Sequence, residues 1–263
     1  MYRNYKSLKQ NLQHQQVMVG TFVMEFAVPQ MATILASAGA DYLIVDLEHT
    51  MFSLQTVGSM IRAARGSDIP AIVRIPSIDR HFVSRSLDAG AAGLMVPRLE
   101  SAEDVKTVSQ YAKFPPDGDR GVAFGIGHTD YGDFRQFDGV NLLQQSNQDL
   151  VLIGQIETVA GLDHLEEILD VGALDVIFIG LYDLSSSLGV SGELAHPKVI
   201  EAVEIIIETV QKRGVILGSY VNDFESGKRW LDAGVKMIAI GNDAFLVTCK
   251  FSEENQKFKT ATG

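Results

Sequence analysis

Short apolar runs recur along the chain, and four of them are entered in the same way. In each case a helix-like end, a glycine and a short link lead into the run, at residues 35–46, 87–97, 169–180 and 231–241. A glycine just past a helix can adopt the left-handed conformation that ends the helix without a steric penalty. The runs lack strict alternation of apolar and polar residues, as expected for parallel strands covered on both faces. We interpret them as junctions between helices and buried parallel strands.

Further apolar runs fill the intervals, at Met18–Val23, Ala71–Ile75, Leu150–Glu157 and Val215–Ser219. Amphipathic patterns lie between them, such as 54–64 and 198–213, where apolar residues recur with helical spacing. Eight predicted strands with helices between most of them favour a single (β/α)8 TIM barrel over an open sheet. We expect one domain over residues 1–263, because no linker or shift in composition divides the chain.

One stretch, residues 114–149, does not follow this pattern. It is long and rich in glycine, and it lies between the fourth and fifth predicted strands. Long connections in compact domains are usually functional or mobile. We therefore expect a long loop at about 114–149.

Composition narrows the class of protein further. The length of 263 residues is usual for one α/β barrel, and the net charge of −11 argues against a surface that binds nucleic acid. The single cysteine, Cys249, excludes an intrachain disulfide framework and fits a reducing compartment. No apolar run approaches the ~18 residues of a membrane span, and the N-terminus lacks the pattern of a signal peptide. We expect a soluble cytoplasmic protein that binds neither nucleic acid nor a membrane.

Polar residues follow several predicted strands at the point where each strand ends. The C-terminal ends of the strands form the active-site face of such a barrel. Polar residues at the ends of this many strands predict an active site on that face, rather than side chains that are merely exposed to solvent. In chain order they are Asp46, Glu48 and His49, then Arg74, Arg98, Gln155, Glu157 and Asp183.

Two of these residues, Glu157 and Asp183, stand on successive βα units, so both can face the barrel mouth. Two carboxylates with open coordination positions suit a hard divalent cation, Mg²⁺ or Mn²⁺, whose shell water and substrate oxygens complete. A structural zinc site is not indicated, since the chain has one cysteine and no His-x-His sequence.

Five motifs, "DLEHT", "VRIP", "LMVP", "QIET" and "FIGLYDLSSSLG", together resemble the HpcH/HpaI family of class II pyruvate aldolases. The resemblance runs in order from about Gly20 to Phe245, nearly the whole chain. It implies a metal-dependent (β/α)8 carbon–carbon lyase that forms or cleaves 4-hydroxy-2-oxo (di)acids through a metal-stabilised pyruvate-type enolate. It also implies a homo-oligomer, commonly a hexamer, acting on small carboxylate substrates.

The resemblance assigns roles that agree with the chemistry. Removing a proton next to a carbonyl requires positive charge at the developing enolate oxygen, which a dication and an arginine supply, and a histidine is a suitable base at neutral pH. The implied roles are metal ligation by Glu157 and Asp183, general base catalysis by His49, enolate stabilisation by Arg74, acceptance by Asp88 of a hydrogen bond from His49, and substrate contacts by Gln155 and Tyr182.

Three residues keep open roles. Asp88 belongs to a Leu-Asp-x-Gly motif that recurs with Asp170 and Asp232, so a structural role is an equal alternative. Asp46 and Glu48 could hold a metal-bound water, or Glu48 could face a helix.

The chain departs from the family pattern at three places. Leu181 replaces a proline, Arg98 follows "VP" where an apolar residue is usual, and "GIGHTDYG" replaces an Arg-bearing stretch of the long loop. Arg98, Arg120 and His128 could add cations beside Arg74, which would suit a substrate with more than one carboxylate. One alternative is therefore a citrate-forming synthase that condenses acetyl-CoA with oxaloacetate in siderophore biosynthesis. A second is a non-catalytic carboxylate-binding barrel.

Overall fold

The structure, a computed structural model, describes residues 8–14, 17–136 and 138–261. Eight parallel strands close a barrel in chain order, and β8 pairs with β1. The prediction of a single (β/α)8 TIM barrel is confirmed. The strands are β1 Met18–Val23, β2 Tyr42–Asp46, β3 Ala71–Arg74, β4 Gly93–Val96, β5 Val151–Ile156, β6 Val176–Ile179, β7 Ile216–Val221 and β8 Met237–Asn242.

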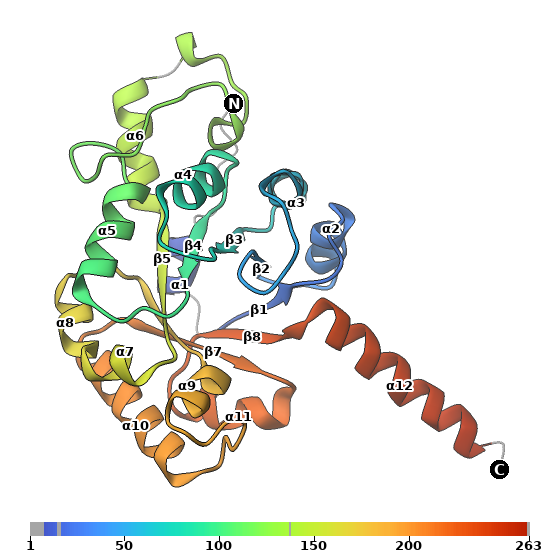
Figure 1. The fold of residues 1–263 in the computed structure, drawn as a ribbon. Helices are drawn as coiled ribbons and strands as arrows, with labels where there is room; N and C mark the ends of the chain where they lie inside the picture. Colours follow the sequence, from blue (N-terminus) through green and yellow to red (C-terminus); the bar gives the residue numbers. More distant parts are fainter. Residues whose placement is uncertain (1–7, 15–16, 137, 262–263) are drawn as a thin grey trace.

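Helices follow the strands and surround the barrel (Figure 1). Several begin at a serine, threonine or aspartate whose side chain accepts a backbone N–H of the first turn, as Ser53, Asp79 and Ser101 do. These helices are α2 Gln30–Ser37, α3 Leu54–Gly66, α4 Arg80–Asp88, α5 Ala102–Ala112, α7 Val159–Asp163, α8 Leu165–Asp170, α9 Leu181–Ser187, α10 Pro197–Lys212 and α11 Phe224–Asp232.

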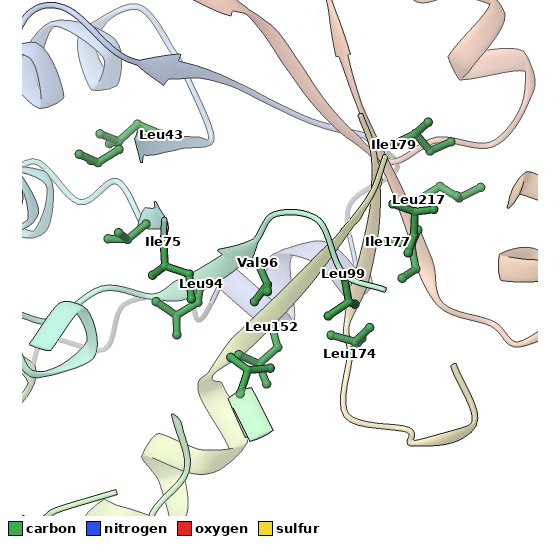
Figure 2. Close-up of a cluster of buried hydrophobic side chains, with 14 of the residues drawn as sticks. Leu43, Ile75, Leu94, Val96, Leu99, Leu152, Leu174, Ile177, Ile179 and Leu217 are labelled. Carbon is green, nitrogen blue, oxygen red and sulfur yellow. The ribbon is translucent and has the colours of Figure 1, made fainter. Parts of the chain in front are cut away.

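Alternate strand residues point out of or into the barrel. The outward set packs against the helices in a large apolar cluster, part of which Figure 2 shows together with residues next to the strands. The inward set forms a second cluster, which Leu8 and Leu12 of α1 (Leu8–His14) join. Lys9 forms a 2.9 Å ion pair with Asp175, just before β6. Helix α1 therefore closes the end of the barrel where the strands begin, and leaves the opposite end for polar groups.

The stretch 114–149 contains more structure than predicted. It includes the helix α6 (Gly139–Asp149) and two 3₁₀ turns, Gly127–Thr129 and Phe134–Gln136, so the expectation of a loop throughout is wrong. It also starts at the end of α5, and α5 runs antiparallel to the strands. The stretch therefore lies at the N-terminal end of the barrel, away from the predicted active-site face.

The last helix, α12 (Asp243–Ala261), extends away from the barrel (Figure 1). Its apolar residues Val247, Phe251 and Phe258 are exposed. Across the part of the chain that the structure describes, no helix combines the length and apolarity needed to cross a membrane.

Candidate active site

A pocket of about 220 Å³ opens at the C-terminal ends of the strands. It is smaller than the ~300–1,000 Å³ that is usual for drug-sized ligands, which indicates a small substrate. Several residues predicted from the strand ends meet there. The pocket is lined by Phe22, Met24, His49, Arg74, Gln155, Phe178, Ile179, Gly180, Leu181, Tyr182, Asp183, Tyr220 and Asn242.

Arg74 is held by Asp46 on the neighbouring strand. In the register of β2 with β3 the two residues are direct partners, and both side chains are buried. The guanidinium Nε and Nη2 donate to the two carboxylate oxygens of Asp46 at 2.7 and 2.8 Å. Such a two-point pair fixes the orientation of the guanidinium as well as its position. Asp46, whose role the sequence left open, is therefore the residue that orients Arg74.

Asp46 also shapes the turn that follows β2. Its carboxylate accepts the backbone N–H groups of Glu48 and His49 at 3.0 and 3.2 Å. The same carboxylate therefore positions Arg74 and the two polar residues of the "DLEHT" motif. This is why a buried strand can end in a charged residue, since each polar atom of that residue has a partner.

The Arg74 guanidinium has two further neighbours. Its central carbon lies 4.9 Å above the centre of the Phe22 ring, a cation–π contact, and Nη1 lies 3.2 Å from Glu48 Oε2. With Phe22 on one side and carboxylates on another, the guanidinium has little freedom to turn. Its remaining N–H groups are available to a ligand in the pocket.

Glu157 is buried at the end of β5 and accepts two hydrogen bonds. Gln155 Nε2 donates to Oε2 at 2.5 Å, and the backbone N–H of Arg98 donates to Oε1 at 2.7 Å. Burial is the main reason why the pKa of Glu157 rises to about 7. The negative charges of Glu48 and Asp183 also raise it, whereas the Arg98 N–H and Arg74 lower it.

The donor set around Glu157 fits a divalent cation. The pKa of Glu48 is also raised, first by burial, and Asp183 contributes to the rise, so three carboxylates converge. Of the buried oxygens nearby, Gln155 Oε1 accepts no hydrogen bond from the described residues, and Glu48 Oε2 forms ion pairs with Arg74 and His49 but no hydrogen bond. Excess negative charge and unused acceptors are what a cation and its water would satisfy.

A divalent cation bound here would keep coordination positions open for water and substrate. Among the described residues, no group of three His, Cys, Asp or Glu side chains is arranged to hold a metal. Glu157 and Asp183 alone would leave most of the shell to water and substrate, as the sequence suggested.

His49 lines the pocket, but the predicted hydrogen bond from His49 to Asp88 does not form. His49 is half-exposed, and its Nε2 lies 3.5 Å from Glu48 Oε2. Asp88 instead accepts from Arg120 at 2.7 Å. The reason is the direction of α4, which follows β3 and places its last residue, Asp88, at the N-terminal end of the barrel. The prediction is corrected: Glu48, not Asp88, is the acidic neighbour of His49 in this chain.

The prediction that Arg98, Arg120 and His128 add cations to the site is also wrong within this chain. The Arg98 side chain is 62% exposed and pairs with Glu100, and only its backbone N–H reaches the site. Arg120 packs over Phe114, with 4.4 Å between the guanidinium carbon and the ring centre.

His128 lies beside the same Phe114 ring. Burial, followed by the charge of Arg120, lowers the pKa of His128 to about 4, so this imidazole is neutral at pH 7. Of the described residues that line the pocket, Arg74 alone carries a permanent positive charge.

Four lining residues lie outside the motifs that the sequence analysis selected, namely Phe22, Met24, Tyr220 and Asn242. Phe22 and Tyr220 are inward positions near the ends of β1 and β7, so the alternation of those strands was the signal that could have found them. Apolar and aromatic residues at such positions are otherwise read as core.

A family model described as HpcH/HpaI aldolase/citrate lyase matches residues 19–249. A hydroxypyruvate/pyruvate aldolase of Paraburkholderia phytofirmans is 35% identical over 218 residues, which cover 81% of this chain and 82% of the relative.

Solved structures show the same likeness. An HpcH/HpaI aldolase from Desulfitobacterium hafniense has a TM-score of 0.90 and 31% identity, with 96% of each chain covered. The citrate synthase SbnG has a TM-score of 0.86 and 26% identity, covering 97% of this chain and 98% of that one. With the matched model extending from β1 into α12, this chain belongs to the HpcH/HpaI aldolase/citrate lyase family.

Proposed function

We propose that this chain is a class II aldolase that forms or cleaves a carbon–carbon bond through the enolate of a pyruvate-type 2-oxo acid. One observation carries the proposal. The guanidinium of Arg74, which Asp46 orients, lines the same pocket as Asp183 and His49. The aldolase names of the relatives support the same reaction class.

Glu157 and Asp183 would hold the divalent cation, Mg²⁺ or Mn²⁺. When bound, the cation supplies positive charge where the 2-oxo group of the substrate gains negative charge. Gln155 keeps Glu157 in place through its Nε2, and its buried Oε1 accepts no hydrogen bond from the described residues.

The remaining steps belong to side chains of this chain. Arg74 donates hydrogen bonds to the substrate and strengthens them as the keto oxygen becomes an enolate oxygen. His49 removes the proton from the carbon next to the carbonyl. Glu48 Oε2 lies 3.5 Å from His49 Nε2 and is the acidic neighbour of this base.

The citrate-forming alternative has one observation in its favour, the likeness to SbnG. The pocket argues against it. A tricarboxylate product needs more than one cationic partner, and the additional cations expected from the sequence do not line the pocket. A carboxylate-binding barrel without catalysis would not need a base beside the oriented arginine.

We also propose that the protein acts as a homo-oligomer in the cytoplasm. The apolar side chains that α12 exposes support an association between copies, since contiguous exposed apolar surface marks interfaces. The free, exposed Cys249 is consistent with a reducing compartment. Light scattering would report the oligomeric state.

Exchange of the pyruvate methyl protons for deuterium tests the aldolase proposal without an acceptor. We expect exchange with Mg²⁺ or Mn²⁺ present, slowed by ~10²-fold or more in His49→Ala because the base is lost. NMR loss of the methyl signal measures it. His14→Ala, at the other end of the barrel, should exchange like the wild type.

Two outcomes would count against these assignments. No exchange in the wild type with either metal would remove the aldolase proposal, and exchange at the acetyl methyl of acetyl-CoA would favour the synthase. Wild-type exchange in His49→Ala would mean that another group is the base.

Gly180→Ala should disrupt the site without adding a polar group. A Cβ at Gly180 would lie 2.6 Å from Glu157 Cβ and 2.9 Å from Gln155 Nε2, closer than van der Waals contact allows. We expect Glu157 to be displaced and the exchange rate to fall by ~10²-fold, since misplacement of about 1 Å can have that effect. Gly66→Ala is the matched control, because a Cβ there meets nothing within 4 Å. Unchanged exchange in Gly180→Ala would show that the position of Glu157 is not critical.

A further inference from the structure

Tyr220 occupies the inward position near the C-terminal end of β7. Two residues earlier, Gly218 also faces inward, since a Cβ there would meet the Phe178 ring of the barrel interior. The Tyr220 ring lies 6.2 Å from the Phe22 ring at a 52° tilt, and Phe22 in turn lies beneath the Arg74 guanidinium. This packing gives the Tyr220 ring a defined place in the pocket wall.

The Tyr220 hydroxyl is available to a ligand. It forms no hydrogen bond with any residue in the described ranges, and neither does the hydroxyl of Tyr182, which lines the same pocket. Burial is the main cause that raises the pKa of Tyr220, with smaller contributions from nearby Tyr182 and Cys249. The phenol is therefore protonated at pH 7 and can donate or accept a hydrogen bond.

The two sides of the pocket differ in chemistry. The groups that act on the 2-oxo acid come from the turn after β2, from β3 and β5, and from the start of α9. The side formed by β7 and β8 contributes Tyr220 and Asn242, both uncharged. Asn242 Oδ1 accepts the backbone N–H of Phe245, which fixes the amide with its NH₂ group unused by that bond.

Charge limits what can bind on that side. Arg74 is already paired with Asp46 and Glu48, and the other ionised groups near the pocket are carboxylates. The proposed cation and Arg74 would be engaged by the oxygens of pyruvate, so a second carboxylate on the substrate would meet no cationic side chain beside Tyr220 and Asn242. Such a charge without a partner is unfavourable in a partly buried site.

We propose that Tyr220 is a specificity-determining residue: with Tyr182 it forms the acceptor side of the pocket and selects small, uncharged aldehydes that carry a hydroxyl group. The proposal rests on the aldolase function proposed above. In the addition, the enolate carbon of pyruvate forms a bond to the aldehyde carbon. The aldehyde oxygen takes up a proton, equivalent to the one removed from the methyl group, and a 4-hydroxy-2-oxo acid results.

Three aldehydes of similar size separate the contributions. Glycolaldehyde carries a hydroxyl, propionaldehyde carries a methyl in its place, and glyoxylate carries a carboxylate. We expect the wild type to prefer glycolaldehyde in kcat/KM for addition to pyruvate. Tyr220→Phe should lower the preference for glycolaldehyde over propionaldehyde by about ten-fold, the effect of one lost hydrogen bond.

Two controls make the result specific. Tyr131→Phe makes the same chemical change at an exposed tyrosine in the 114–149 stretch, and should leave the preference as in the wild type. Deuterium exchange into pyruvate, measured in every variant, reports enolate formation separately from acceptor choice.

The outcomes distinguish this proposal from the function on which it rests. If the wild type exchanges pyruvate protons but prefers glyoxylate, or if Tyr220→Phe keeps the full preference for glycolaldehyde, the specificity proposal is overturned and the aldolase proposal stands. If the wild type shows no exchange, the aldolase proposal is the one that fails.

Discussion

Glu157→Ala and Asp183→Ala are each expected to abolish binding of Mg²⁺ or Mn²⁺, and with it all deuterium exchange into pyruvate. The two carboxylates would be the only protein ligands of the cation, so either substitution removes one of two protein ligands. The fold should survive, because each change removes negative charge from a place where three carboxylates already oppose one another. Isothermal calorimetry measures the affinity, and thermal unfolding without metal checks the fold.

Glu167→Ala is a suitable control for this pair. Glu167 is exposed on α8, and its loss should change neither metal affinity nor exchange. Unchanged affinity for both cations in Glu157→Ala and Asp183→Ala would show that the metal assignment is wrong. A wild type that binds neither cation and still catalyses exchange would show that the reaction runs without one.

Arg74→Lys is expected to lower turnover by ~10²–10³-fold, the scale of losing one donor to a developing oxyanion. The guanidinium spans both oxygens of Asp46 and still has N–H groups for the substrate. A lysine ammonium is a point donor at the end of a flexible chain and cannot keep both contacts in place. It would also lose much of the planar contact with Phe22. Steady-state turnover with pyruvate and glycolaldehyde measures the effect.

The chain contains a matched control for that change. Arg135 makes the same two-point pair with Asp133, at 2.8 Å for each bond, but its side chain is 78% exposed. Arg135→Lys should leave turnover unchanged. Turnover of Arg74→Lys within a few-fold of the wild type would mean that Arg74 is a structural partner of Asp46 only.

The barrel could be predicted because its signals are local. A glycine after several of the helices and an apolar run after the link are properties of short segments, and their repetition implies parallel strands in order. Register and partner choice are not local. Asp46 and Arg74 are 28 positions apart, and they meet because β2 and β3 pair in one particular register. An aspartate at a strand end looks the same in the sequence whether it meets an arginine, a metal or water.

Helix direction decided where two predicted basic residues lie, and this too is not a local property of the sequence. Arg120 and His128 lie in a stretch between two strands, and a sequence does not mark which end of the barrel such a stretch occupies. Because α5 reverses the direction of the chain, the stretch begins at the N-terminal end, where Arg120 meets Asp88. Arg120, which was predicted to add a cation for the substrate, therefore pairs with the last residue of α4.

By itself the sequence determined the barrel and the residues at the ends of its strands. These depend on hydrophobic periodicity and on a topology in which all parallel strands end on one face. Only the tertiary structure decided what each of those residues meets. Asp46 orients Arg74, a backbone N–H of Arg98 rather than its guanidinium holds Glu157, and Tyr220 enters the pocket through strand alternation. These pairings arise from register, helix direction and side-chain packing between segments far apart in the chain, where no local pattern records them.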